Sequence, residues 1–314
     1  MIEILHPGFL TTVQDGGRYG YQRFGVPVCG AMDAFALSQA NILAGNPPEE
    51  AALEITALGP QIRFTEDTVF ALAGADFCYT LNDRPLKNGG AYFAQAGEIL
   101  ACGSAQNGFR AYIAFPGGLD LPRVMSSRST CLSAHFGGFH GRALQKGDCI
   151  GLRCPQLWLK GLESRTACCH YDSDQPLRVV LGPQEDAFLP EAIEQFFREE
   201  YRMSANCDRM GCRLEGTALP LRGSANIISD GIAMGAIQIP DGKPIIMMAD
   251  RQTTGGYVKL GTVITADLPL AAQKKPGDAV HFAPVTVCQA QQILREKNRS
   301  LRNWAESLED QRIW

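Results

Sequence analysis

The stretch GKPIIMMADRQTTGGY, residues 242–257, joins a continuous apolar run to a dense group of polar side chains. The run PIIMM (244–248) is typical of a strand buried in a β fold. The nine residues after it, 249–257, bring together an acid, a base, an amide, two hydroxyl groups, two glycines and a phenol. Polar groups at the end of a core strand often line a pocket. We therefore expect a buried strand that leads into a binding site.

Similar strand-like runs recur along the 314 residues and are separated by Gly, Pro, Asn and Asp. They are TVFALAG (68–74), FCYTLND (77–83), RAYIAFPGG (110–118), LRVVLG (177–182) and PIIMMAD (244–250). A Gly-acid phrase opens three further runs, AGEILA (96–101), KGDCIGL (146–152) and PGDAVHF (276–282). Glycine accepts the positive φ of a tight turn, and the acid can bond to the turn backbone. Repeated turns of this kind favour barrels or sandwiches.

Few segments have helical features. Asp33 is a candidate N-cap for AFALSQANILA (34–44), with Gly45 just past the end. Pro190 opens a second helix, PEAIEQFFREEY (190–201), because proline is tolerated in a first turn. In the tail, apolar residues recur every seven positions from Val287 to Leu308. That third helix either packs on the body of the protein or binds a partner, and we favour packing.

The strand rhythm breaks at PQLWLKGLESRTACCHYDSDQP (155–176), which indicates a domain boundary. We predict an N-terminal half over residues 1–160, a C-terminal half over 176–285 and a C-terminal helix over 286–314. GRYGYQRFGVPVCGAMD (17–33) and DRMGCRLEG (208–216) share an Arg-x-Gly phrase, which suggests that the two halves are related.

Charge and cysteine content narrow the class of protein. The net charge of −4 gives no electrostatic reason to expect a nucleic-acid or anionic-membrane partner. No apolar run approaches the roughly 18 residues of a membrane span. The start, MIEILHPGF, lacks the features of a signal peptide, so we expect a cytoplasmic protein whose eleven cysteines are thiols without disulfides. CCH (168–170) and CDRMGC (207–212) contain no CxxC pair, and we predict no metal site.

Three polar stretches beside glycines are candidates for one cleft, with an anion-binding side and a proton-transfer side. The first stretch is 11–21, the second is 125–141 and the third is 249–259. The candidate residues are Gln14, Asp15, Arg18, Arg128, Ser129, Gln238, Asp250, Gln252, Thr253, Thr254, Tyr257 and Lys259.

Several of these candidates have a second interpretation. Arg18 either clamps a carboxylate or phosphate or pairs with Asp15. Residues 126–130, SSRST, form either an anion nest or a solvated turn. Glu54 lies inside the apolar run ALEIT (52–56), where a buried carboxylate requires a partner. It either meets an arginine of the cleft or lies on an exposed strand face, and we favour the arginine.

Seven segments of the sequence match a known pattern. The segments resemble, in order over residues 1–285, the biotin-dependent carboxyltransferase-like family, which includes allophanate hydrolase subunit 2, the carboxyltransferase part of urea carboxylase, KipA and the C subunit of 5-oxoprolinase. The matching segments are TTVQDGGRYGY (11–21), GAMDAFALSQANILAGN (30–46), ALEITALGPQIRF (52–64), RAYIAFPGGLDLP (110–122), SSRST (126–130), GAIQIPDGKPIIMMADRQTTGGY (235–257) and KPGDAVHF (275–282).

The resemblance implies a mainly β fold with few helices, in which two related cyclophilin-like β-barrel halves have a cleft between them. For a stand-alone chain of this length it implies the C subunit of an ATP-dependent 5-oxoprolinase, which opens 5-oxo-L-proline to L-glutamate together with a KipI-like B subunit and an A subunit. ATP and Mg²⁺ are expected in that complex, and this chain carries no biotin attachment site. Two alternatives remain: a carboxyltransferase component for urea or a related amide with a biotinylated partner, and a non-catalytic KipA-like regulator that binds a KipI-like partner.

The reaction assigns expected roles to the candidates. Opening a lactam requires a clamp for the substrate carboxylate, donors for developing charge and a group that transfers protons. Arg18 or Arg128 is the expected clamp. Gln238, Gln252 and Thr253 are expected to orient the lactam, and Asp250 or Lys259 to transfer protons.

Overall fold

The computed structural model describes residues 1–154, 165–172 and 174–309. The chain divides into two compact units. The first comprises Met1–Arg18, Cys29–Tyr171 and Ser300–Trp314, and the second comprises Tyr19–Val28 and Asp172–Arg299. Much of the predicted boundary at 155–176 lies outside the described residues, so the limits of the predicted halves, and the cleft between them, stay predictions.

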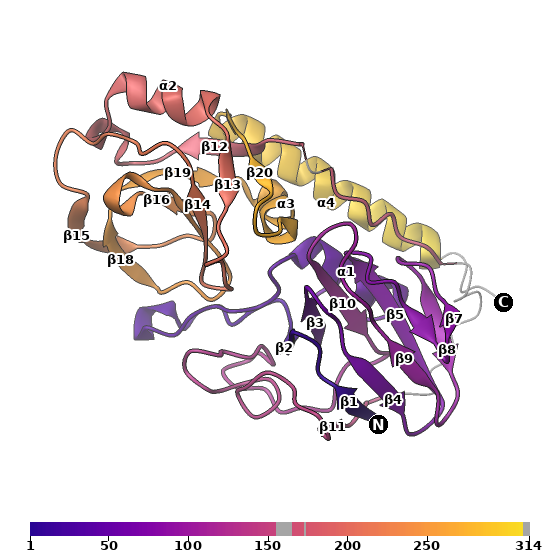
Figure 1. Ribbon diagram of the computed structural model, residues 1–314. Helices are drawn as coiled ribbons and strands as arrows, with labels where there is room; N and C mark the ends of the chain where they lie inside the picture. The colour runs from indigo at the N-terminus through magenta and orange to yellow at the C-terminus, as the bar shows by residue number, and fades with distance from the viewer. Residues whose placement is uncertain (155–164, 173, 310–314) are drawn as a thin grey trace. The chain divides into compact units, whose positions relative to one another are not determined.

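The first unit is built from two antiparallel sheets (Figure 1). In the described residues, one sheet has the order β11-β1-β4-β9-β6-β7 and the other has the order β2-β3-β10-β5-β8. The strands are β1 (Ile2–His6), β2 (Leu10–Gln14), β3 (Ala52–Thr56), β4 (Gln61–Phe64), β5 (Thr68–Gly74), β6 (Thr80–Leu81), β7 (Arg84–Pro85), β8 (Ala91–Ala94), β9 (Ile99–Ala101), β10 (Arg110–Ala114) and β11 (Cys149–Ile150).

The sheet β2-β3-β10-β5-β8 packs against an apolar core on each of its two faces. Leu53, Ile55 and Ile113 belong to the main core together with Ile4 and Phe64 of the other sheet. The opposite face carries a second core, because β3, β5 and β10 are buried on both sides. Helix α1 (Ala34–Leu43) covers that face and packs on β5 and β10.

The predicted cap of α1 is confirmed. The side chain of Asp33 accepts a hydrogen bond from the backbone N–H of Ala36 at 2.9 Å. Gly45 follows the helix with a φ of +78°. The N-cap satisfies one of the amide groups that a helix leaves unpaired at its start, so the local sequence alone determines where this helix begins.

In the second unit, one sheet nearly closes on itself. Its order in the described residues is β20-β13-β14-β17-β16-β19-β12-β21, and only one residue, His281, separates the two edge strands β20 and β21. The two edges of the sheet therefore come together as in a nearly closed barrel. The strands are β12 (Leu177–Leu181), β13 (Tyr201–Met203), β14 (Gly211–Glu215), β16 (Ala236–Gln238), β17 (Ile245–Met247), β19 (Lys259–Val263), β20 (Ala279–Val280) and β21 (Phe282–Pro284).

A two-stranded ribbon of β15 (Asn226–Gly231) and β18 (Thr254–Tyr257) accompanies this sheet. Helix α2 (Pro190–Arg198) begins at the predicted proline, whereas α3 (Leu268–Gln273) was not predicted. The long helix α4 (Val287–Glu309) confirms the predicted tail helix. Its last turns pack on the second core of the first unit through Leu301 and Leu308, as the favoured interpretation requires. The prediction of a mainly β fold with few helices is confirmed.

Candidate functional site

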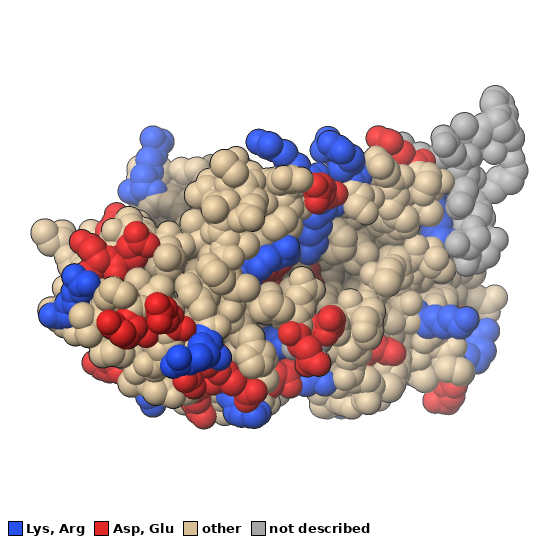
Figure 2. Space-filling model, turned by 90° about the horizontal axis from the view of Figure 1, so that it is seen from above, with Lys and Arg blue, Asp and Glu red and all other residues tan. Residues whose placement is uncertain are grey.

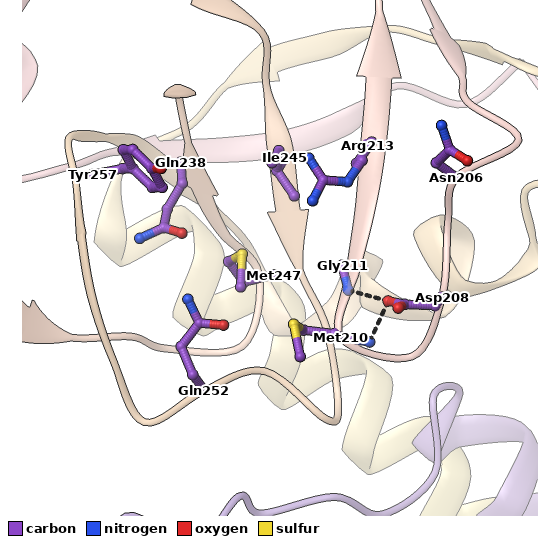
Figure 3. Close-up of a pocket in the computed structure, with 10 residues that line it drawn as sticks. All are labelled: Asn206, Asp208, Met210, Gly211, Arg213, Gln238, Ile245, Met247, Gln252 and Tyr257. Atoms are coloured by element: carbon purple, nitrogen blue, oxygen red, sulfur yellow. Dashed lines mark hydrogen bonds between the residues drawn. The ribbon is translucent and has the colours of Figure 1, made fainter. Parts of the chain in front are cut away.

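A cavity of about 230 Å³ opens in the second unit beside the stretch that follows β17 (Figure 3). Strand residues form one wall: Gly211, Arg213, Gln238, Ile245 and Met247. The β13–β14 loop, the segment after β17 and the end of β18 supply the rest: Asn206, Asp208, Met210, Gln252 and Tyr257. Of the predicted site residues, the structure therefore brings Gln238, Gln252 and Tyr257 together here.

The strand register sets the order of three side chains in this pocket. Ile245 on β17 pairs with Arg213 on β14 and with Gln238 on β16. Residues paired directly across neighbouring strands point to the same face. The next pair, Cys212 and Ile246, is buried on the opposite face. Arg213, Ile245 and Gln238 therefore form a row across three strands.

Gln238 presents an unsatisfied donor. Its side chain is only 2 % exposed, and its Nε2 atom has no hydrogen-bond partner among the described residues. Gly255 makes room for this amide, since a Cβ built there would stand 2.7 Å from Gln238 Nε2. A buried polar group without a partner costs free energy, which a ligand with an acceptor atom would recover.

Arg213 is the pocket's cation, and sequence reasoning missed it. Its side chain is exposed and forms no ion pair within the described residues, and it points toward Ile245 in Figure 3. The nearby carboxylate of Asp208 instead accepts from the backbone N–H groups of Met210 and Gly211, at 2.8 and 3.0 Å. The alternation of β14, GCRLE, with Cys212 and Leu214 buried, is the signal that could have placed Arg213 on the outer face.

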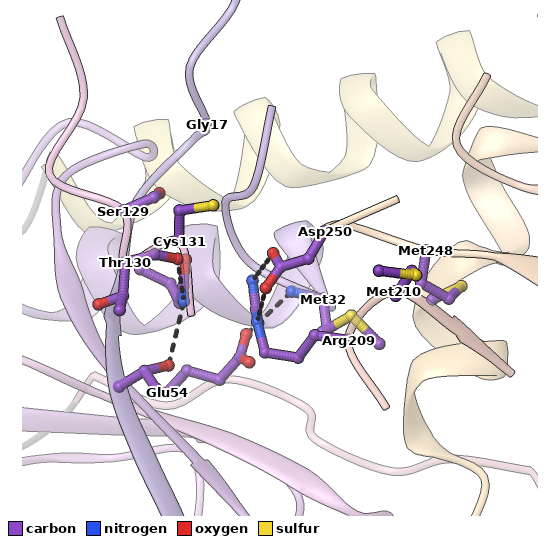
Figure 4. A network of polar contacts seen from close by, with 12 residues as sticks. Gly17, Met32, Glu54, Ser129, Thr130, Cys131, Arg209, Met210, Met248 and Asp250 are labelled. Atoms are coloured by element: carbon purple, nitrogen blue, oxygen red, sulfur yellow. Dashed lines mark hydrogen bonds and ion pairs between the residues drawn. The ribbon is translucent and has the colours of Figure 1, made fainter. Parts of the chain in front are cut away.

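Asp250 lies in a buried ion pair. Its two carboxylate oxygens accept from Arg209 Nε at 3.0 Å and from Arg209 Nη2 at 2.8 Å (Figure 4). Both side chains are nearly inaccessible to solvent. A bidentate pair fixes the carboxylate geometrically, which is the behaviour of a structural or positioning group more than of a mobile base. The assignment of Asp250 to catalysis stays a prediction, and its partner Arg209 was not among the predicted site residues.

The other predicted proton-transfer group, Lys259, is also paired. Its Nζ donates to Asp230 Oδ2 at 2.5 Å and to the carbonyl of Gly231 at 3.2 Å. The hydrogen bond from Lys259 lowers the pKa of Asp230. Lys259 does not line the pocket, and neither do Thr253 and Thr254. Their predicted roles stay predictions.

In the first unit, Asp15 organises the SSRST segment. Its carboxylate accepts from Ser127 Oγ at 2.8 Å, from Ser129 Oγ at 2.5 Å and from the backbone N–H of Arg128 at 2.6 Å. It also accepts from the N–H of Gly17 at 2.9 Å. Because the serine hydroxyls are directed at this carboxylate, the segment is neither a solvated turn nor an open nest for an external anion.

Arg18 does not pair with Asp15. Its guanidinium donates to the carbonyls of Val124 and Ser129, at 3.0 and 2.8 Å, and lies 4.7 Å from the ring centre of Phe136. Arg18 Nη1 is buried without a partner in the described residues, as is the Oε1 atom of Gln14. Because neither atom has a partner in the described residues, the prediction that Arg18 and Gln14 contact a ligand remains to be tested.

The remaining predicted residues of the first unit have partners within that unit. Arg128 donates to Glu50 at 3.2 Å and to the carbonyl of Leu121 at 2.7 Å. Burial lowers the pKa of this guanidinium. Glu54 is 1 % exposed and accepts from the hydroxyl of Tyr112 at 2.7 Å and from the N–H of Met32 at 2.9 Å. The alternative that Glu54 lies on an exposed strand face is therefore wrong.

In the described residues, neither the surface charges nor the metal-ligating types of side chain identify a further site. On the face seen in Figure 2, basic and acidic side chains are interspersed. Within the described residues there is no group of three or more His, Cys, Asp and Glu side chains placed to hold a metal ion. The helices described here include none that is long and apolar enough to cross a membrane.

Comparison with known proteins gives a consistent result. Residues 24–284 match the family described as carboxyltransferase domain, subdomain A and B. The chain is 37 % identical to the 5-oxoprolinase C subunit of Haemophilus influenzae over 95 % of both chains. It is 35 % identical to the 5-oxoprolinase C subunit of Escherichia coli over 95 % of this chain and 96 % of that one.

Larger proteins contain a similar segment. A urea amidolyase of Lachancea kluyveri is 33 % identical over 99 % of this chain but only 18 % of its own length. Among solved structures, the urea amidolyase of K. lactis matches with a TM-score of 0.89 and 33 % identity, over 96 % of this chain and 20 % of that chain. The protein TTHA0988 matches with a TM-score of 0.81 and 29 % identity, over 90 % of this chain and 56 % of that chain.

Proposed function

Because this chain belongs to the carboxyltransferase domain family of subdomains A and B, we propose that it is the C subunit of a 5-oxoprolinase. The complex opens the lactam of 5-oxo-L-proline to L-glutamate with hydrolysis of ATP. The proposal rests on how completely the chains match one another. The matches to two bacterial C subunits extend over 95 % or more of this chain and of each relative. The match to urea amidolyase leaves most of that protein uncovered.

The pocket of the second unit supplies groups that suit a small amide. Gln238 Nε2 is a buried donor for a carbonyl oxygen, and Gln252 points toward it from the opposite side of the pocket (Figure 3). Ile245 and Met247 give an apolar surface for the methylene groups of a ring. A cavity of about 230 Å³ is small beside the roughly 300–1,000 Å³ of pockets for drug-sized ligands. The substrate is therefore a compact molecule held by a few polar contacts.

This chain is one part of the catalyst. Within the described residues no group of three or more His, Cys, Asp and Glu side chains is placed to hold a metal ion. We place nucleotide and magnesium in the complex with the A subunit and a KipI-like B subunit, where the metal is held largely through phosphate oxygens. In this chain Asp250 and Lys259, both ion-paired, keep neighbouring backbone in place, and a proton-transfer role for either is a proposal to be tested by substitution.

Coexpression with the partner subunits tests the proposal. The complex should form glutamate from 5-oxoproline only when ATP is present, and the isolated chain should be inactive. Complete ring opening by this chain alone would contradict the proposed division of labour.

A second candidate function, carboxyl transfer to urea, rests on the match to urea amidolyase. It predicts that a biotinylated partner and bicarbonate, with urea, support ATP hydrolysis. If urea and bicarbonate replace 5-oxoproline as the substrates that drive turnover, this second function takes the place of the first.

A further inference from the structure

We infer that the row Arg213–Ile245–Gln238 determines specificity by reading two groups of one ligand, a carboxylate at Arg213 and an amide carbonyl at Gln238. The inference rests on the proposed function and adds to it the residues that select a carboxylate-bearing lactam. It assigns Arg213 the role of carboxylate clamp that sequence reasoning gave to Arg18 or Arg128.

The spacing of the row suits such a ligand. Arg213 and Gln238 occupy the strands on either side of Ile245, and neighbouring strands lie about 4.8 Å apart. The two backbone positions are thus roughly 10 Å apart, with both side chains on one face. Ile245 lies between them and offers an apolar contact. The ring of 5-oxoproline carries its carbonyl and its carboxylate on either side of the nitrogen, and its two methylene groups supply the apolar surface that would contact Ile245.

The two polar ends differ in what they recognise. Gln238 Nε2 is a neutral, buried donor, which suits a carbonyl oxygen. Arg213 is an exposed cation that forms no ion pair within the described residues, and a guanidinium binds a carboxylate through two parallel hydrogen bonds. The acid in the same pocket, Asp208, is directed to the backbone N–H groups of its own loop, so it leaves Arg213 available. Urea offers a carbonyl but no carboxylate, so only one end of the row would be used.

A pair of ligands isolates the contribution of Arg213. 2-Pyrrolidinone is the ring of 5-oxoproline without the carboxylate. The affinity of the complete complex for each ligand is measured by calorimetry, and kcat and KM by glutamate formation. In Arg213→Met, the affinity for 5-oxoproline should fall about 10- to 100-fold, as expected when a charged hydrogen bond is lost. The affinity for 2-pyrrolidinone should not change, and KM should rise more than kcat falls.

Two further variants complete the design. Gln238→Met, which removes the amide at similar length, should weaken both ligands. Arg198→Met is the matched control, because Arg198 is exposed on α2 and lies 3.9 Å from the carboxylate of Glu199. It should bind both ligands as the wild type does. Thermal unfolding of each variant identifies losses caused by misfolding, and Arg213→Lys, which keeps the charge, should recover part of the affinity for 5-oxoproline.

The outcomes separate the inference from the function on which it rests. If the wild-type complex turns over 5-oxoproline and folded Arg213→Met binds both ligands normally, or loses both equally, the inference is overturned and the function stands. If the wild type binds 5-oxoproline through Arg213 but makes no glutamate, the function fails and the recognition stands.

Discussion

Gly255 has no side chain, and the shape of the pocket depends on that. A Cβ added there would lie 2.5 Å from Ile232 Cδ1 and 2.7 Å from Gln238 Nε2. We expect Gly255→Ala to displace the Gln238 amide, to weaken the binding of 5-oxoproline about tenfold or more, and to cost about 1–3 kcal/mol of stability through overpacking. Calorimetry and urea unfolding measure the two effects. Gly223→Ala is the control, because a Cβ at Gly223 meets nothing within 4 Å.

Asp250→Asn distinguishes a structural carboxylate from a catalytic one. Removing one partner from a buried ion pair typically costs about 3–5 kcal/mol. We therefore expect a large fall in the free energy of unfolding, measured in urea. Asp186→Asn is the control, because Asp186 is exposed and its substitution should leave stability unchanged. A variant that keeps wild-type stability but loses about 10²-fold or more in turnover would instead identify Asp250 as a base.

At the scale of elements, the Gly-acid turns are the part of the fold that sequence determines most directly. Gly97, Gly147 and Gly277 have φ values of +91°, +90° and +89°. In each turn the acid after the glycine accepts from the backbone N–H three residues earlier, at 2.8, 2.7 and 2.8 Å. Each turn leads into a strand, β9, β11 or β20. These turns could be predicted because every interaction in them is local.

One of these acids makes the stability of the protein depend on pH. The hydrogen bond from Arg142 lowers the pKa of Asp148. A carboxylate with a lowered folded pKa stabilises the protein above the usual aspartate value of about 4, and that contribution is lost as the pH falls through the folded value. The stability difference between the wild type and Asp148→Asn should be present at pH 7 and should shrink at pH 3, in urea unfolding. An equal difference at both pH values would contradict this.

The site was less predictable than the turns, for a physical reason. Gln238, Gln252 and Tyr257, which line the candidate pocket, could be chosen from the sequence because they stand near one polar stretch. Arg213 and Asp208 come from other segments, and only the pairing of β14 with β17 brings them to the pocket. Pairing between distant strands is not encoded in local pattern. The same limit applies to Arg209, whose role depends on a partner 41 residues away.

At the scale of the whole molecule, the cysteines give a simple test of the chemical state. None of the eleven, all of which lie in the described part of the chain, takes part in a disulfide. Cys207 and Cys212, the two cysteines of the segment CDRMGC, are both free thiols. Thiol titration of the denatured protein without reductant should therefore find eleven reactive groups. A lower count in freshly purified protein would contradict the prediction.

The central claim concerns what the assembled molecule does, and the stoichiometry of the complete complex tests it most directly. Purified partner subunits with this chain should convert 5-oxoproline to glutamate with one ADP formed per glutamate, and omission of this chain should abolish glutamate formation. Glutamate formation at an unchanged rate without this chain, or ATP hydrolysis that 5-oxoproline does not stimulate, would contradict its assignment as an essential part of a 5-oxoprolinase.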